Sequence, residues 1–142
     1  LANKAEDQCS RIQQELANIQ QRLEGLQANE RRLRQLYAEY HERLTRPGAE
    51  SSGMQDAINQ RQFMHQITGL IDKVLQDQSI TQQALGQTRQ KMAEAQREKL
   101  KMQALVEQDQ HRLRVAEKVQ DQKLMDELAL RKFQVRETPR HA

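Results

Sequence analysis

Apolar residues recur along the first 44 positions of the chain at spacings that alternate between three and four residues. This heptad repeat predicts a helix with an apolar seam that packs against another helix. Glu30 is the only charged residue in the seam. The seam positions are Ala2, Ala5, Cys9, Ile12, Leu16, Ile19, Leu23, Leu26, Glu30, Leu33, Tyr37, Tyr40 and Leu44.

The helical pattern is interrupted once, where Pro47, Gly48 and Gly53 stand close together. Proline and glycine end helices, and Ser52 followed three residues later by Gln55 fits a capping box. We therefore expect a single coiled-coil domain over residues 1–142. Its parts are a first helix over about 1–46, a loop over about 47–53 and a second helix over about 54–135.

The second helix carries its own heptad seam, so the short loop should fold the two helices into an antiparallel hairpin. The predicted fold is all-α, a two-helix coiled-coil hairpin with a longer second helix. Two registers keep both seams in phase: one pairs Leu33 with Ile71, the other, shifted by a heptad, pairs Leu33 with Met64. The second seam comprises Met64, Ile67, Ile71, Val74, Gln78, Thr81, Leu85, Thr88, Met92 and Ala95.

Beyond about Met102, nothing in the first helix remains to cover the second, and its heptad pattern loosens. This overhang would either insert into another protein or be a frayed or self-associating end. Because the chain opens at Leu1 without a methionine, we expect that residues of the natural N-terminus are missing and would cover part of it. Its apolar positions are Leu105, Val106, Leu113, Ala116, Val119, Leu124 and Leu128.

The composition of the chain argues against a nucleic-acid-binding protein, a membrane-spanning protein and a disulfide-bonded protein. The 23 basic and 20 acidic residues are interspersed, which is typical of a solvated helix surface and not of a nucleic-acid site. No apolar run approaches the ~20 residues of a membrane span, and no signal peptide is visible. The single cysteine, Cys9, excludes an intramolecular disulfide and occupies a seam position, where a small buried hydrophobe is expected.

The sequence lacks the patterns of catalytic and cofactor sites. It has no glycine-rich phosphate loop, nucleophile elbow or zinc-protease motif. Its four histidines, His41, His65, His111 and His141, show no spacing with acids or cysteine that would make a metal site. We therefore expect no enzymatic activity, no cofactor and no metal.

The aromatic residues cluster near the loop. Tyr37 and Tyr40 are seam positions, so packing is their expected role, whereas Phe63 lies one residue off the second seam. Phe63 should therefore be partly exposed beside Leu36 and Leu70, which makes it a candidate interface anchor.

Taken together, several short segments resemble the FliJ family, the soluble stalk component of flagellar type III protein export. The resemblance covers nearly the whole chain, and it depends on the joint spacing of the segments because each one alone is weak. They are Leu1-Ala2 with Lys4-Ala5-Glu6-Asp7, Glu39-Tyr40, Asn59-Gln60-Arg61-Gln62-Phe63, Arg97-Glu98-Lys99 and Asp121-Gln122-Lys123-Leu124-Met125-Asp126-Glu127.

The resemblance implies a long antiparallel coiled coil, similar to the stalk of rotary ATPases. Its free helical termini would enter the pore of a hexameric export ATPase (FliI-like), and it would also contact the export gate protein (FlhA-like) and escort export chaperones. The protein would be cytoplasmic and peripheral at the inner face of the cell membrane, with no transmembrane segment and no nucleic-acid partner.

The resemblance also implies two sets of partner-binding residues. The gate-binding face comprises Leu33, Leu36, Tyr40, Phe63, Ile67 and Leu70. Leu36 and Val74 depart from the side chains of relatives, which affects the expected affinity. This face favours the register that pairs Leu33 with Ile71. The ATPase-binding overhang is represented by Leu113, Val119, Leu124 and Leu128.

Two alternatives share the coiled-coil pattern. The injectisome counterpart, the YscO family, has the same architecture in a different secretion system. For either family, the sequence does not give the stoichiometry with the ATPase. A prefoldin-like chaperone would need β-strands between its helices, which the eight residues from Arg46 to Gly53 are too few to supply.

Overall fold

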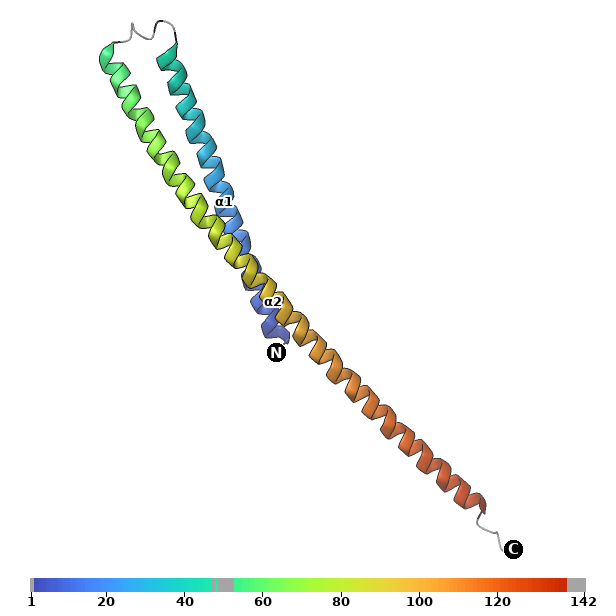
Figure 1. Ribbon diagram of the computed structural model, residues 1–142. Coiled ribbons are helices and arrows are strands. Elements are labelled where there is room, and N and C mark those ends of the chain that lie inside the picture. The colour runs from blue at the N-terminus through green and yellow to red at the C-terminus, as the bar shows by residue number, and fades with distance from the viewer. Residues whose placement is uncertain (1, 47, 49–52, 138–142) are drawn as a thin grey trace. The chain divides into compact units, whose positions relative to one another are not determined.

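The computed structural model describes residues 2–46, 48 and 53–137, which form two helices and no strand (Figure 1). Helix α1 spans Ala2–Thr45 and helix α2 spans Met54–Glu137, with 44 and 84 residues. The prediction of an all-α fold, with two packed helices and a longer second helix, is confirmed. The predicted capping residue Ser52 and the histidine at position 141 lie outside the described residues.

The chain divides into two compact units, which we describe separately. The first, Asp7–Gln96, contains the packed parts of α1 and α2 and is called the hairpin unit. The second includes the described C-terminal part of α2, residues 97–137, which is called the C-terminal arm. The prediction of a single domain stays a prediction.

The core of the hairpin unit is the seam between its two helices. All ten predicted seam positions of α2 are buried or half-buried, as are those of α1 from Cys9 to Leu44 with one exception. The exception is Tyr37, which is 38% exposed because it stacks along α1 on His41, with ring centroids 6.3 Å apart and planes at 6°. Ile67 is the most deeply buried large side chain, at 1% exposure.

The register of the two helices follows from contacts at the end of the hairpin unit away from the loop. Cys9, Ile12 and Ala95 form one buried cluster, and Met92 packs against it. This cluster matches the register that pairs Ile12 with Met92. The alternative register would place Met92 and Ala95 beyond Ile12 by two turns or more, so it is wrong for this structure.

A polar layer interrupts the apolar seam at Glu30. Gln78, only 9% exposed, donates a hydrogen bond of 2.9 Å from Nε2 to Oε1 of Glu30 on the other helix. Arg34 donates to Oε2 of the same carboxylate at 2.7 Å. The bonds from Arg34 and, second, from Gln78 lower the pKa of Glu30, because they favour its charged form. Polar pairs inside a coiled coil specify register, so this layer opposes a slip of one heptad.

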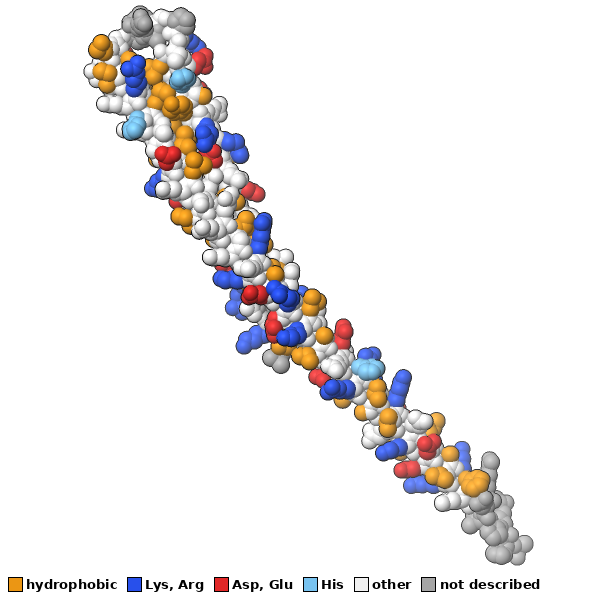
Figure 2. Space-filling view, in the orientation of Figure 1, with side chains coloured by type: hydrophobic (Ala, Val, Ile, Leu, Met, Phe, Trp, Pro, Cys, Tyr) orange, Lys and Arg blue, Asp and Glu red, His pale blue; other side chains and the backbone are white. Residues whose placement is uncertain are grey.

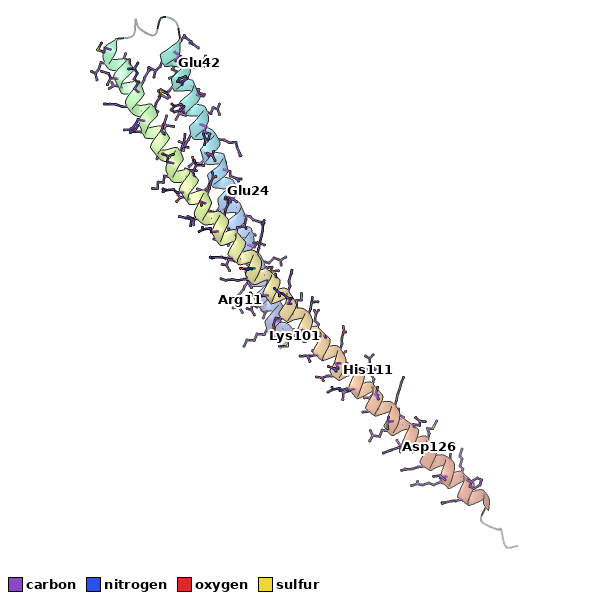
Figure 3. All side chains as sticks on the ribbon, in the orientation of Figure 1. Arg11, Glu24, Glu42, Lys101, His111 and Asp126 are labelled. Atoms are coloured by element: carbon purple, nitrogen blue, oxygen red, sulfur yellow. The ribbon has the colours of Figure 1, made fainter. Side chains whose placement is uncertain are left out.

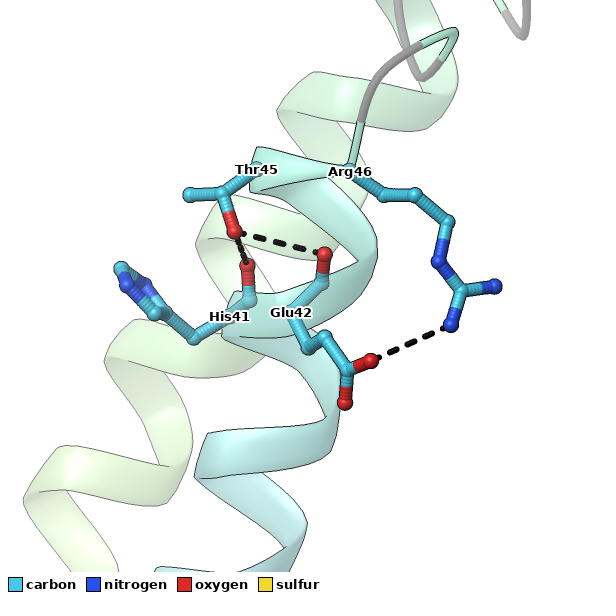
Figure 4. A network of polar contacts seen from close by, with 4 residues as sticks. All are labelled: His41, Glu42, Thr45 and Arg46. Carbon is cyan, nitrogen blue, oxygen red and sulfur yellow. Dashed lines mark hydrogen bonds and ion pairs between the residues drawn. The ribbon is translucent and has the colours of Figure 1, made fainter.

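Side-chain hydrogen bonds and a glycine define the helix ends next to the loop. The hydroxyl of Thr45 donates to the carbonyl oxygens of His41 and Glu42, at 2.9 and 3.3 Å, and Arg46 pairs with Glu42 at 3.1 Å (Figure 4). At the start of α2, the amide of Ala57 donates to the carbonyl of Gly53. Gly53 has a φ of 92°, which a residue with a Cβ adopts only with strain.

Alanine in place of the three mid-helix glycines should stabilise the hairpin unit. A Cβ at Gly25, Gly69 or Gly86 would meet nothing within 4 Å, so only the helix propensity changes, by about 1 kcal/mol per site. We expect a gain of about 2–3 kcal/mol in the free energy of unfolding for the triple variant, measured by urea denaturation. Gly53→Ala is the control and should destabilise, because its φ is positive. A loss of stability in the triple variant would contradict this account.

Candidate functional site

The six residues predicted to form one partner-binding face lie together at the loop end of the hairpin unit. We call them the loop-end patch; they are Leu33, Leu36 and Tyr40 of α1 with Phe63, Ile67 and Leu70 of α2. The antiparallel pairing of the helices brings the two groups together. Their exposure differs greatly, which separates residues able to touch a partner from residues that support them.

Phe63 and Leu70 are the exposed members of the loop-end patch, at 38% and 51%. They are seven residues apart, and therefore lie on the same side of α2. Leu36, which was expected to lie beside Phe63, is half-buried. The prediction that Phe63 is partly exposed is confirmed.

Tyr40 and Phe63 form an aromatic pair across the two helices. Their ring centroids are 4.8 Å apart with planes tilted by 50°, and the guanidinium carbon of Arg43 lies 5.2 Å from the centroid of Tyr40. Tilted aromatic pairs and cation–π contacts each stabilise a defined ring orientation. The sequence reasoning missed Arg43, although its spacing of three residues from Tyr40 on one helix could have indicated the contact.

Ile67 is the most deeply buried member of the loop-end patch. With 1% exposure it belongs to the core, between Met64 and the next turn of the seam. Its place in the binding face stays a prediction, and its packing supports the backbone that carries Phe63 and Leu70. Leu33 is half-buried and has an intermediate position.

The C-terminal arm presents the second predicted site. Every described side chain from position 104 to 135 is exposed, including His111 and Asp126 (Figure 3). The four predicted ATPase-binding residues, Leu113, Val119, Leu124 and Leu128, are exposed by 65%, 50%, 55% and 52%. Exposed fractions this large are unusual for several apolar side chains along one helix.

The apolar residues of the arm form two stripes. At about 100° per residue, Leu113, Leu124 and Leu128 lie within about 60° of one another. Val119 lies on nearly the opposite side, in line with Val115. The four predicted residues therefore do not share one face. A helix that is apolar on opposite sides is suited to an environment that surrounds it, whereas a helix that packs on one surface needs a single stripe.

The described residues were searched for groups of metal ligands and for membrane-spanning helices. No group of three His, Cys, Asp or Glu side chains among them could hold a metal ion. Neither described helix is long and apolar enough to cross a membrane. The described helices present apolar, aromatic and charged side chains on their surfaces, which are suited to binding other proteins.

Comparison with known proteins identifies the family. No curated protein and no solved structure matched the chain. The profile of the family described as Flagellar FliJ protein matches residues 1–138, nearly the whole sequence. The chain therefore belongs to the FliJ family, whose members are non-catalytic components of flagellar protein export.

Proposed function

We propose that this chain is the stalk of the flagellar export apparatus, coupling a hexameric export ATPase to the export gate and escorting export chaperones. It would act in the cytoplasm, peripherally at the inner face of the cell membrane. The observation that carries this proposal is that each compact unit has its own exposed apolar surface, the hairpin unit at its loop end and the C-terminal arm along its helix.

The C-terminal arm is the proposed ATPase-binding element. A ring-shaped ATPase surrounds whatever enters its pore, and the arm has apolar side chains on opposite sides, including Leu128 and Val119. A single helix is also narrow, at about 10–12 Å across with its side chains. These properties fit a pore more closely than a flat protein surface.

The loop-end patch is the proposed gate-binding element. Phe63 supplies the exposed aromatic surface that anchors many protein interfaces, and Tyr40 holds its ring in place. Leu70 adds apolar surface one heptad along α2. Arg43 contributes a charge at the rim, next to Tyr40.

Phe63→Ala should weaken gate binding and leave ATPase stimulation unchanged. Losing a central aromatic anchor costs about 2 kcal/mol, or roughly thirtyfold in affinity. The variant would be titrated against the isolated cytoplasmic domain of the gate, beside an assay of the ATPase and a motility assay. Leu75→Ala is the matched control, because Leu75 is on the same helix and is also 38% exposed.

The control separates a local interface from a general loss of apolar surface. Leu75→Ala should bind the gate as the wild type does. If Phe63→Ala kept full gate affinity with an unchanged melting temperature, the loop-end patch would not be the gate site.

The family match favours flagellar export over the injectisome counterpart. Motility of a deletion strain would test this part of the proposal, since an injectisome component would leave swimming intact. The described residues contain no strand, and nothing in them favours a prefoldin-like chaperone.

A further inference from the structure

The hairpin unit has a second groove beside its loop, distinct from the loop-end patch. It is a hollow of about 440 Å³ between α1 and α2. Leu36 and Phe63 of the loop-end patch lie on one flank of the seam, and the groove lies on the other. The residues that line it are Tyr37, His41, Leu44, Thr45, Arg61, Met64, His65 and Thr68.

The floor of this groove is apolar. Met64 is buried at 8% exposure and Leu44 is half-buried. The hydroxyl of Thr68 donates to the carbonyl of Met64 at 3.0 Å, and that of Thr45 donates within α1. Both hydroxyl protons are donated within their own helices, so neither is available to a polar ligand. The floor is therefore suited to apolar side chains.

The rim of the groove carries nitrogen donors that have no side-chain partner among the described residues. Arg61 and His65 form no hydrogen bond or ion pair with the described residues, and His41 only stacks on Tyr37. None of the residues lining the groove is Asp or Glu. Figure 2 shows histidine side chains near the loop end, with hydrophobic surface beside them.

A second and more open hollow, of about 460 Å³, adjoins the first on the outer surface of α2, which alone supplies its lining. It shares Arg61 and His65 with the groove and adds Ile58, which is 41% exposed, and two glutamines. Two hollows on either side of a ridge formed by Arg61 and His65 could each receive one apolar side chain. Carboxylates between those side chains would reach the ridge.

We propose that this pair of hollows binds an acidic amphipathic helix of a partner protein. Its apolar residues occupy the two hollows and its carboxylates accept hydrogen bonds from Arg61, His65 and His41. The charge of the rim selects the partner: an arginine between apolar hollows with no acid among the lining residues attracts carboxylates and disfavours basic helices. This surface goes beyond the gate and ATPase contacts proposed above.

The test uses a synthetic amphipathic helix with Leu at the a and d heptad positions and Glu at e and g, labelled for fluorescence anisotropy. A matched peptide carries Lys in place of Glu. The acidic peptide should bind the full chain, and the basic peptide should bind at least about tenfold more weakly.

Variants of the chain locate the binding. Arg61→Glu should weaken binding of the acidic peptide about tenfold or more, because it replaces an attractive charge by a repulsive one. Arg22→Glu, an exposed substitution on α1 with the same change in net charge, should alter binding less than about twofold, and so should Phe63→Ala. Circular dichroism would verify that each variant keeps its helical content.

Several results would overturn the proposal. Equal binding of the two peptides would show that charge does not select the occupant, and equal losses in Arg61→Glu and Arg22→Glu would show that binding is not at the groove. A concentration-dependent dimer of the chain alone that Arg61→Glu abolishes would assign the groove to a second copy.

Discussion

Replacing Ile67 by alanine should destabilise the hairpin unit by about 3 kcal/mol. Ile67 is 1% exposed in the centre of the seam, and truncating a buried isoleucine removes apolar contacts and leaves a cavity, at a cost of 2–5 kcal/mol. In a unit held by one narrow seam, few other side chains are available to close that cavity. Urea denaturation of the wild type and of the variant measures the difference.

Ile80→Ala is the matched control for this prediction. Ile80 is on the same helix but is 64% exposed, so the same truncation should change the free energy of unfolding by less than about 0.5 kcal/mol. The Ile67→Ala variant should lose gate affinity only under conditions in which the variant is partly unfolded. Similar stabilities of the two variants would contradict the burial of Ile67.

Deleting the residues after Val119 should abolish stimulation of the ATPase and leave gate binding intact. The deletion removes Leu124 and Leu128 from one stripe of the C-terminal arm and Phe133 from the other, and all three are more than half exposed. Removing several anchors of one interface reduces affinity by orders of magnitude. The ATPase assay and the gate titration would be run on the same preparation.

Point variants distinguish lost contacts from a shortened helix. Leu124→Ser combined with Leu128→Ser should reproduce most of the deletion's effect, whereas Asp126→Ser, in the same segment, should retain stimulation. If the deletion variant stimulated the ATPase fully, the arm would have no role there, and the proposed stalk function would fail independently of the gate contact.

The six residues of the loop-end patch were placed by the family resemblance, and periodicity added an expectation for the exposure of Phe63. One residue off the seam, Phe63 had to be partly exposed, and it is. Ile67 fits the seam equally well, yet the family resemblance placed it in the binding face. The heptad position of Ile67 predicts that its side chain is buried, but only the structure shows that the burial is nearly complete.

The polar features of the hairpin unit were harder to predict. The sequence identified Glu30 as an exception in the seam but not its bond to Gln78, since that contact depends on a register that both seams left open. The groove with Arg61 and His65 was missed for the same reason. Side chains on two helices form one surface only after their register is fixed.

The sequence by itself determined that this protein is two helices with apolar seams, joined at one break, because heptad spacing and a proline act locally along the chain. The tertiary structure decided the register, the depth at which each seam residue lies, and which polar groups meet across the helices. Those properties depend on side chains far apart in sequence, such as Ile12 and Met92, and local periodicity leaves equivalent solutions one heptad apart.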